Sequence, residues 1–158
     1  MDKIKLDDTN VNSILTCVVG IGNPLRGDDG AGAFVCRQLE EKNIAGLSVF
    51  ISHQLDMGLA EELSTFDRVV FIDASLEESY FSFLPLSIDN KEVQPFSHQV
   101  NMGVLAGLCG QLFNSPTAFY VCAIGARSFE IGEGLSASTK EHALAAITQL
   151  ESWIKEPA

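Results

Sequence analysis

The feature that most constrains the fold is the stretch from Cys17 to Gly32, which reads CVVGIGNPLRGDDGAG. An apolar run at residues 14–19 leads into a glycine-rich turn. Apolar residues then recur between positions 31 and 39 at the spacing of one helix face. The stretch therefore predicts a buried strand, a tight turn and a helix, the building unit of α/β folds.

Two adjacent carboxylates, Asp28 and Asp29, end the glycine-rich turn. Gly22 and Gly27 have the spacing of a P-loop, but the two acids stand where that motif has Lys and Ser or Thr. A dinucleotide-binding turn would need glycine at the position of Leu25. Carboxylates repel a pyrophosphate and attract a cation, so the turn suits a metal or a cationic group. Helix capping by aspartate is the alternative explanation.

The rest of the chain alternates between strand and helix patterns. We expect strands at 13–20, 47–52, 68–73 and 117–125, an edge hairpin or antiparallel strand at 80–87, helices at 29–42, 57–66 and 97–113, and a last helix that Ser138 and Glu141 begin as a capping box. This order predicts an α/β fold with three layers, in which helices cover both faces of a twisted, mostly parallel five-stranded sheet. Residues 1–12 are expected to form a flexible extension, and 13–158 a single domain.

Composition argues against several classes of partner. The formal net charge of −11 opposes binding to nucleic acid and to anionic membranes. No apolar run reaches the roughly 18 residues of a membrane helix, and the first residues have neither the basic nor the apolar region of a secretory signal, so we expect a cytoplasmic protein. The four cysteines lie in apolar patterns without C-x-x-C spacing and are expected to be reduced core residues.

Three candidate metal ligands are expected at one edge of the sheet. Asp29 follows the first strand, Asp73 ends the third strand, and His98 precedes the third helix. Ligands of parallel sheets bind at the carboxyl ends of the strands. Two carboxylates and an imidazole suit nickel, zinc or iron better than calcium or magnesium, and three protein ligands leave positions open for substrate or water. His53 follows the second strand on the same edge and is a further candidate to line the site.

The chain contains, in this order, the segments GIGNPLRGDDGAG, RVVFIDA, PFSHQVNMGVLAGL and AIGARSFEIGEGLSASTKEHALAAI. Together they resemble the [NiFe]-hydrogenase maturation endopeptidases, and the resemblance extends from about residue 15 to residue 154. It implies a protease that removes a short C-terminal peptide from the hydrogenase large-subunit precursor once nickel has been inserted. Asp29, Asp73 and His98 fall on the metal-recognising positions of the family, and the resemblance implies that they are the catalytic residues.

The resemblance also bears on the metal and on the substrate. In the family the nickel belongs to the substrate, and the protease reads it as a sign that the cluster is finished. Many members have an acid-Gly-Gly-Thr turn after the second strand, whereas this chain reads SHQLDMGLAEEL. Versions with HQL resemble the branch that processes bidirectional, soluble-type hydrogenases. We expect His53 or Gln54 to replace the missing acidic contact, and Asn23 and Asp28 to contact the substrate.

Several mechanisms and two other functions stay open at this point. The nickel can act as a Lewis acid on the scissile carbonyl, lower the pKa of a bound water, or position the peptide. We favour positioning with water activation, with a carboxylate or His98 moving the proton. The other functions are a non-catalytic chaperone that inspects the metal without cutting, and a nucleotide-binding α/β domain. The protein is expected to be a monomer or a weak dimer.

Overall fold

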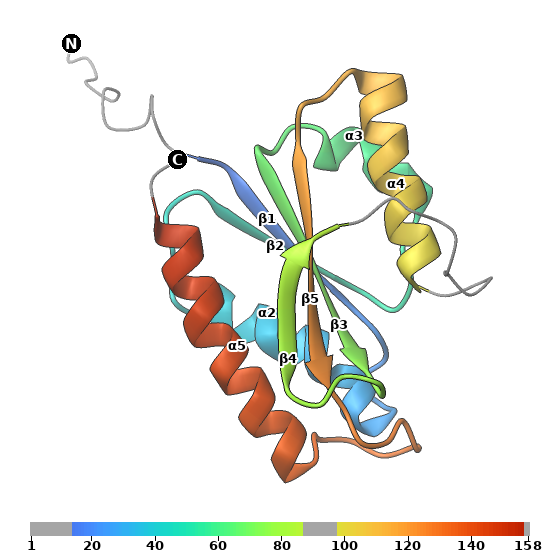
Figure 1. Cartoon of the computed structure of the whole chain (residues 1–158), viewed down its shortest axis with the longest axis vertical. Coiled ribbons are helices and arrows are strands. Elements are labelled where there is room, and N and C mark those ends of the chain that lie inside the picture. The colour runs from blue at the N-terminus through green and yellow to red at the C-terminus, as the bar shows by residue number, and fades with distance from the viewer. Residues whose placement is uncertain (1–13, 87–97, 157–158) are drawn as a thin grey trace.

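The computed structural model describes residues 14–86 and 98–156, without the side chains of residues 98–100. A five-stranded sheet forms its centre, with the strand order β2-β1-β3-β5-β4 (Figure 1). The strands are β1 (Thr16–Ile21), β2 (Leu47–Ser52), β3 (Arg68–Ser75), β4 (Phe81–Pro85) and β5 (Ala118–Gly125). The first three and β5 are parallel, and β4 pairs with β5 in the antiparallel direction at one edge.

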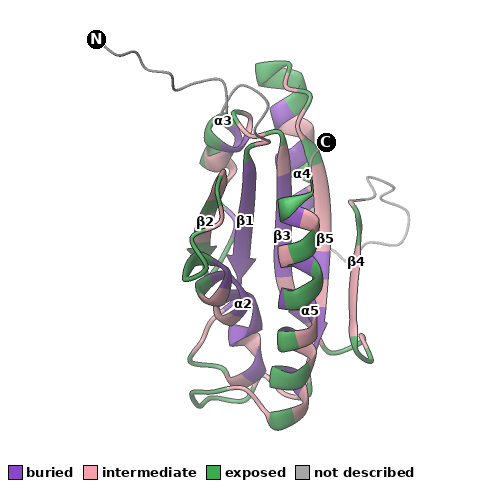
Figure 2. Cartoon of the chain, turned by 90° about the vertical axis from the view of Figure 1, so that its left-hand side faces the viewer, coloured by how far each residue is buried: buried purple, intermediate pink, exposed green. Residues whose placement is uncertain are grey.

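Helices cover both faces of the sheet. The α-helices are α2 (Ala31–Glu40), α3 (Ala60–Leu63), α4 (His98–Phe113) and α5 (Ala137–Lys155), and two short 3₁₀ turns precede α2 and α3, η1 (Gly27–Gly30) and η2 (Met57–Leu59). Residues of α2 and α5 share one apolar core with the sheet, and residues of α3 and α4 share the other. Figure 2 shows the central strands β1 and β3 buried between these layers. A strand that is apolar along its whole length, as β1 is, fits this position because both its faces are covered.

The start of α2 lies directly against the carboxyl ends of two neighbouring strands. In the register of the sheet, Gly20 of β1 is opposite Ile72 of β3. A Cβ atom on Gly32 would lie 2.4 Å from the Ile72 carbonyl oxygen and 2.9 Å from the Ile21 nitrogen. Only glycine permits so close an approach, and this contact holds the turn before α2 over the end of β3.

The structure confirms the predicted fold class and the antiparallel edge strand, and it moves three helix starts. The predicted helices at 29–42 and 57–66 are each a 3₁₀ turn followed by a shorter α-helix, α2 and α3. The prediction that Ser138 caps the last helix is wrong: Ser136 is the N-cap, and its Oγ accepts a hydrogen bond from the Thr139 N–H. The predicted extension at 1–12 lies outside the described residues. None of the helices that the structure describes is long and apolar enough to span a membrane.

Candidate active site

The glycine-rich turn holds the Asp29 carboxylate in place. The backbone N–H of Asn23 donates a hydrogen bond of 2.8 Å to Asp29 Oδ2. Asn23 itself closes the turn, since its Oδ1 accepts from the Leu25 N–H at 2.9 Å. Asp29 is half-buried, and its Oδ1 accepts no hydrogen bond from any residue that the structure describes. One carboxylate oxygen is thus fixed by the turn, while the other is available to a ligand.

Gly22 makes this arrangement sterically feasible. Its φ angle is +130°, a conformation that residues with a side chain rarely adopt. A Cβ atom at this position would lie 2.2 Å from the Asp29 carbonyl oxygen and 3.0 Å from Asp29 Oδ1. Any side chain at position 22 would therefore displace the Asp29 carboxylate.

Asp28, the preceding residue, turns in the opposite direction and is only 2% exposed. Its Oδ1 accepts from the Ser136 N–H at 2.6 Å, and its Oδ2 accepts from the Ser136 hydroxyl at 2.9 Å. Oδ2 also accepts from the N–H groups of Arg127 at 2.8 Å and Ser128 at 3.3 Å. This burial does not fit the substrate contact predicted for Asp28; the carboxylate joins the turn to the start of α5.

These contacts shift the pKa of the Asp28 carboxyl. Burial alone would raise the pKa, but the hydrogen bonds from the Ser136 and Arg127 N–H groups, with those from the Thr139 and Ser136 hydroxyls, outweigh burial and lower it. The carboxyl group is therefore ionised at neutral pH. It is a fixed negative charge that is already satisfied by donors of the protein itself.

The backbone of residues 126–136, which we call the 126–136 loop, lies along the glycine-rich turn (Figure 1). Gly27 N–H donates to the Gly132 carbonyl at 2.7 Å, and Gly132 N–H donates to the Leu25 carbonyl at 2.8 Å. Further along, Asp28 N–H donates to the Ser128 carbonyl at 3.1 Å. The Nε of Arg26 donates to the Phe129 carbonyl at 3.1 Å. Turn and loop therefore form one hydrogen-bonded unit.

The other predicted site residues lie at or near the same edge. Asp73, half-buried, follows Ile72 near the carboxyl end of β3. His98 is the first residue of α4, which begins on the side toward which the arrows of β1, β3 and β5 point (Figure 1). The side chain of His98 lies outside the described residues. Since the prediction of three ligands depends on that side chain, the three-ligand site stays a prediction.

His53 and Gln54 are exposed and follow β2 directly. Ser52, the last residue of β2, accepts a hydrogen bond of 3.0 Å at its carbonyl from the Gly22 N–H. The two residues that follow it therefore lie beside the glycine-rich turn. The predicted substrate contacts of His53 and Gln54 remain predictions. Their exposure beside the turn is compatible with such contacts.

The turn has no backbone donors left to bind a phosphate. Apart from Pro24, which has no N–H, each residue from Gly22 to Asp29 donates its N–H to an oxygen of the protein. A phosphate-binding turn needs several free N–H groups that point at the anion. Together with the two acids, this argues against the nucleotide-binding alternative.

The described side chains do not complete a metal site on their own. Within residues 14–86 and 101–156, no three side chains of His, Cys, Asp or Glu lie together in a way that would hold a metal ion. Asp29 and Asp73 supply oxygen donors only. The imidazole of His98, the third predicted ligand, lies outside the described residues.

Neither a protein-family model nor a curated protein matches the chain at the level of sequence. Solved structures do match its fold. The hydrogenase maturating endopeptidase HybD from E. coli superposes with a TM-score of 0.76 at 16% identity, over 90% of this chain and 93% of that one. The [NiFe] hydrogenase maturation protease HycI from Thermococcus kodakarensis superposes with a TM-score of 0.72 at 20% identity, over 96% and 99%. A HybD protease from T. kodakarensis is 24% identical, with a TM-score of 0.66 over 90% and 100%. The fold of this chain is therefore that of the hydrogenase maturation proteases.

Proposed function

We propose that this protein is an endopeptidase that removes the C-terminal peptide of a [NiFe]-hydrogenase large-subunit precursor after nickel insertion. The observation that carries the proposal is the fold, which agrees with solved hydrogenase maturation proteases over about nine-tenths of both chains or more. The sequence motifs that resemble this family supply the acids of the site. Asp29 lies in η1, on the turn that follows β1, and Asp73 lies near the carboxyl end of the adjacent strand β3.

In this proposal the nickel is part of the substrate and docks against Asp29, Asp73 and His98. The Asn23 N–H holds one oxygen of Asp29, so the other oxygen is oriented toward the incoming cation before substrate binds. Nickel bound there positions the scissile peptide and lowers the pKa of a water molecule. One of the carboxylates or His98 takes the proton from that water and passes it to the leaving amine. His53 and Gln54, beside the turn, contact the region of the substrate around the metal and select the soluble, bidirectional branch of hydrogenases.

Incubation of the purified protein with a nickel-loaded large-subunit precursor tests the proposal. Mass spectrometry should show the loss of a C-terminal peptide from the precursor. Substitutions Asp29→Asn, Asp73→Asn and His98→Ala should each slow this processing by roughly 100-fold or more, the typical contribution of a proton-transferring or charge-stabilising group.

Asp56→Asn is the matched control. Asp56 is an exposed carboxylate in the segment after β2 that accepts a hydrogen bond from the Gly58 N–H, and asparagine preserves that bond. This variant should process the precursor at the rate of the wild-type protein. Full processing by all three site variants would refute the proposed site. Binding of the loaded precursor without any change in its mass would favour the chaperone.

A further inference from the structure

The tip of the 126–136 loop exposes a large apolar side chain. Ile131 is 91% exposed, and Leu25, on the glycine-rich turn, is 55% exposed. Arg26 and Gly132 form a parallel β-bridge, so the residues that precede them, Leu25 and Ile131, lie opposite each other. We call these two residues the Leu25–Ile131 patch. Contiguous exposed apolar side chains, unlike single scattered ones, mark interaction sites.

The patch is rigid, because hydrogen bonds fix its backbone on both sides. The bonds from Gly27 N–H to the Gly132 carbonyl and from Gly132 N–H to the Leu25 carbonyl enclose it. The buried Asp28 carboxylate holds the base of the loop through the Arg127 N–H. A loop that is already ordered loses little backbone entropy when a partner covers it. Most of the free energy gained by burying its apolar side chain is therefore available for binding.

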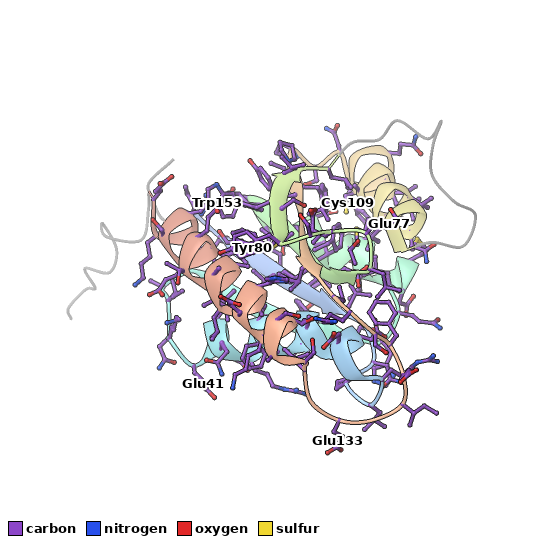
Figure 3. The ribbon with its side chains drawn as sticks, turned by 60° about the horizontal axis from the view of Figure 1, so that its bottom comes forward. Glu41, Glu77, Tyr80, Cys109, Glu133 and Trp153 are labelled. Atoms are coloured by element: carbon purple, nitrogen blue, oxygen red, sulfur yellow. The ribbon has the colours of Figure 1, made fainter. Side chains whose placement is uncertain are left out.

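Charges around the patch indicate the chemistry of the partner. Glu130 and Glu133 are exposed, and neither forms an ion pair with a residue that the structure describes. Figure 3 shows Glu133 pointing away from the ribbon at the tip of the loop. Residues 128–136 contain these two carboxylates and no cation. Two arginines flank this stretch, Arg26 and Arg127, and the Nε of Arg26 is already bonded to the Phe129 carbonyl.

We propose that the Leu25–Ile131 patch is a docking anchor for the large-subunit precursor, which receives Ile131 in an apolar recess rimmed by basic residues. This inference rests on the proposed function. Leu25 and Asp29 belong to the same glycine-rich turn, and the Gly132 N–H donates to the Leu25 carbonyl, so the patch adjoins the turn that carries the proposed site. A second copy of this chain is a poor occupant, because 21 acidic residues against 10 basic ones make two copies repel each other.

Steady-state processing kinetics of the full-length protein test the docking anchor. Ile131→Ser should raise the KM for the nickel-loaded precursor about tenfold and leave kcat unchanged, as expected for an anchor that contributes binding and no chemistry. Leu25→Ser should act in the same direction. Glu130→Gln combined with Glu133→Gln should lower the association rate at low salt about two- to tenfold and make it less dependent on ionic strength.

Leu112→Ser is the matched control. Leu112 is 66% exposed and lies near the end of α4, far along the helix from His98. Its substitution removes a similar exposed apolar side chain and should change neither KM nor kcat. Urea denaturation of each variant checks that the fold is retained.

Direct binding of the precursor to the immobilised protein separates this inference from the proposed function. If the wild-type protein binds the precursor without cleaving it, the proposed function fails, while weaker binding by Ile131→Ser still supports the anchor. Equal binding by wild-type and Ile131→Ser proteins would overturn the anchor. A wild-type dimer in sedimentation that Ile131→Ser dissociates would also overturn it, because the patch would then bind a second copy.

Discussion

Replacing Asp28 with asparagine tests whether this acid is structural. The two oxygens of the Asp28 carboxylate accept hydrogen bonds from the N–H groups of Ser136, Arg127 and Ser128 and from the Ser136 hydroxyl. Asparagine has one acceptor oxygen in place of two. Whichever way its amide is oriented, its NH₂ group faces a backbone N–H, of Ser136 or of Arg127, that has lost its acceptor.

The expected loss of stability follows from these bonds. One buried N–H without an acceptor costs about 1–3 kcal/mol, and the remaining bonds lose the contribution of the negative charge. We therefore expect Asp28→Asn to lower the free energy of unfolding by about 3–5 kcal/mol. This is a large part of the roughly 5–15 kcal/mol that stabilises an ordinary domain.

Urea denaturation measures this loss, and Asp29→Asn is the matched control next to it in the chain. Asp29 accepts one hydrogen bond from the described residues, from the Asn23 N–H at 2.8 Å, and the oxygen of asparagine can accept the same bond. Asp29→Asn should therefore cost about 1 kcal/mol or less. If the two variants lose equal stability, the separate roles assigned to the two acids are wrong.

Three further predictions concern pH, the turn and the thiols. Hydrogen bonds lower the pKa of Asp28 in the folded protein, so its contribution to stability is complete above the unfolded pKa of about 4 and is lost as pH falls through the lower folded pKa. The stability difference between wild type and Asp28→Asn should therefore be constant above about pH 5 and shrink as pH falls below about 4; a difference that stays constant below about pH 4 would contradict this. Gly22→Ala should lower the free energy of unfolding by about 2–4 kcal/mol, because alanine must adopt the φ of +130° and displace Asp29. An unchanged midpoint of urea denaturation would refute the strain expected at this position. Burial, with the nearby Glu62 carboxylate, raises the pKa of Cys17 to about 12, and burial with Glu78 raises the pKa of Cys122 to about 12. Because all four cysteines are buried, alkylation of their thiols at about pH 8 should require denaturant. Rapid labelling of the native protein would contradict this prediction.

Much of the fold was predictable because apolar periodicity dictates which segments are buried. The apolar run at residues 14–19 is typical of a strand covered on both faces, and β1 (Thr16–Ile21) is buried along its whole length. The bounds of β2, residues 47–52, agree with the prediction, as does the antiparallel direction of the edge strand β4. The predicted start of the last helix is wrong because two serines, Ser136 and Ser138, lie close to it. The spacing of Ser138 and Glu141 is that of a capping box and predicts Ser138 as the N-cap. The N-cap is Ser136, whose hydroxyl also donates a hydrogen bond to the distant Asp28 carboxylate.

The site was less predictable, because its geometry depends on contacts between distant segments. Asp28 and Ser136 are 108 residues apart, and no local pattern connects them. The predicted role of Asp28 in substrate contact came from its place in a motif. A motif fixes residue types, but it does not specify the direction in which each carboxylate turns.

The two acids of one dipeptide acquire opposite roles from the donors around them. The 126–136 loop and the start of α5 supply Asp28 with hydrogen bonds from Arg127, Ser128 and Ser136, so its charge is satisfied inside the protein. Asp29 receives one bond from the turn and keeps an oxygen for a ligand. Because Asp28 joins the 126–136 loop to the turn that holds Asp29, the buried acid helps to fix the position of its more exposed neighbour. In the proposed function the turn therefore needs both carboxylates, Asp28 to hold its structure and Asp29 to meet the cation of the substrate.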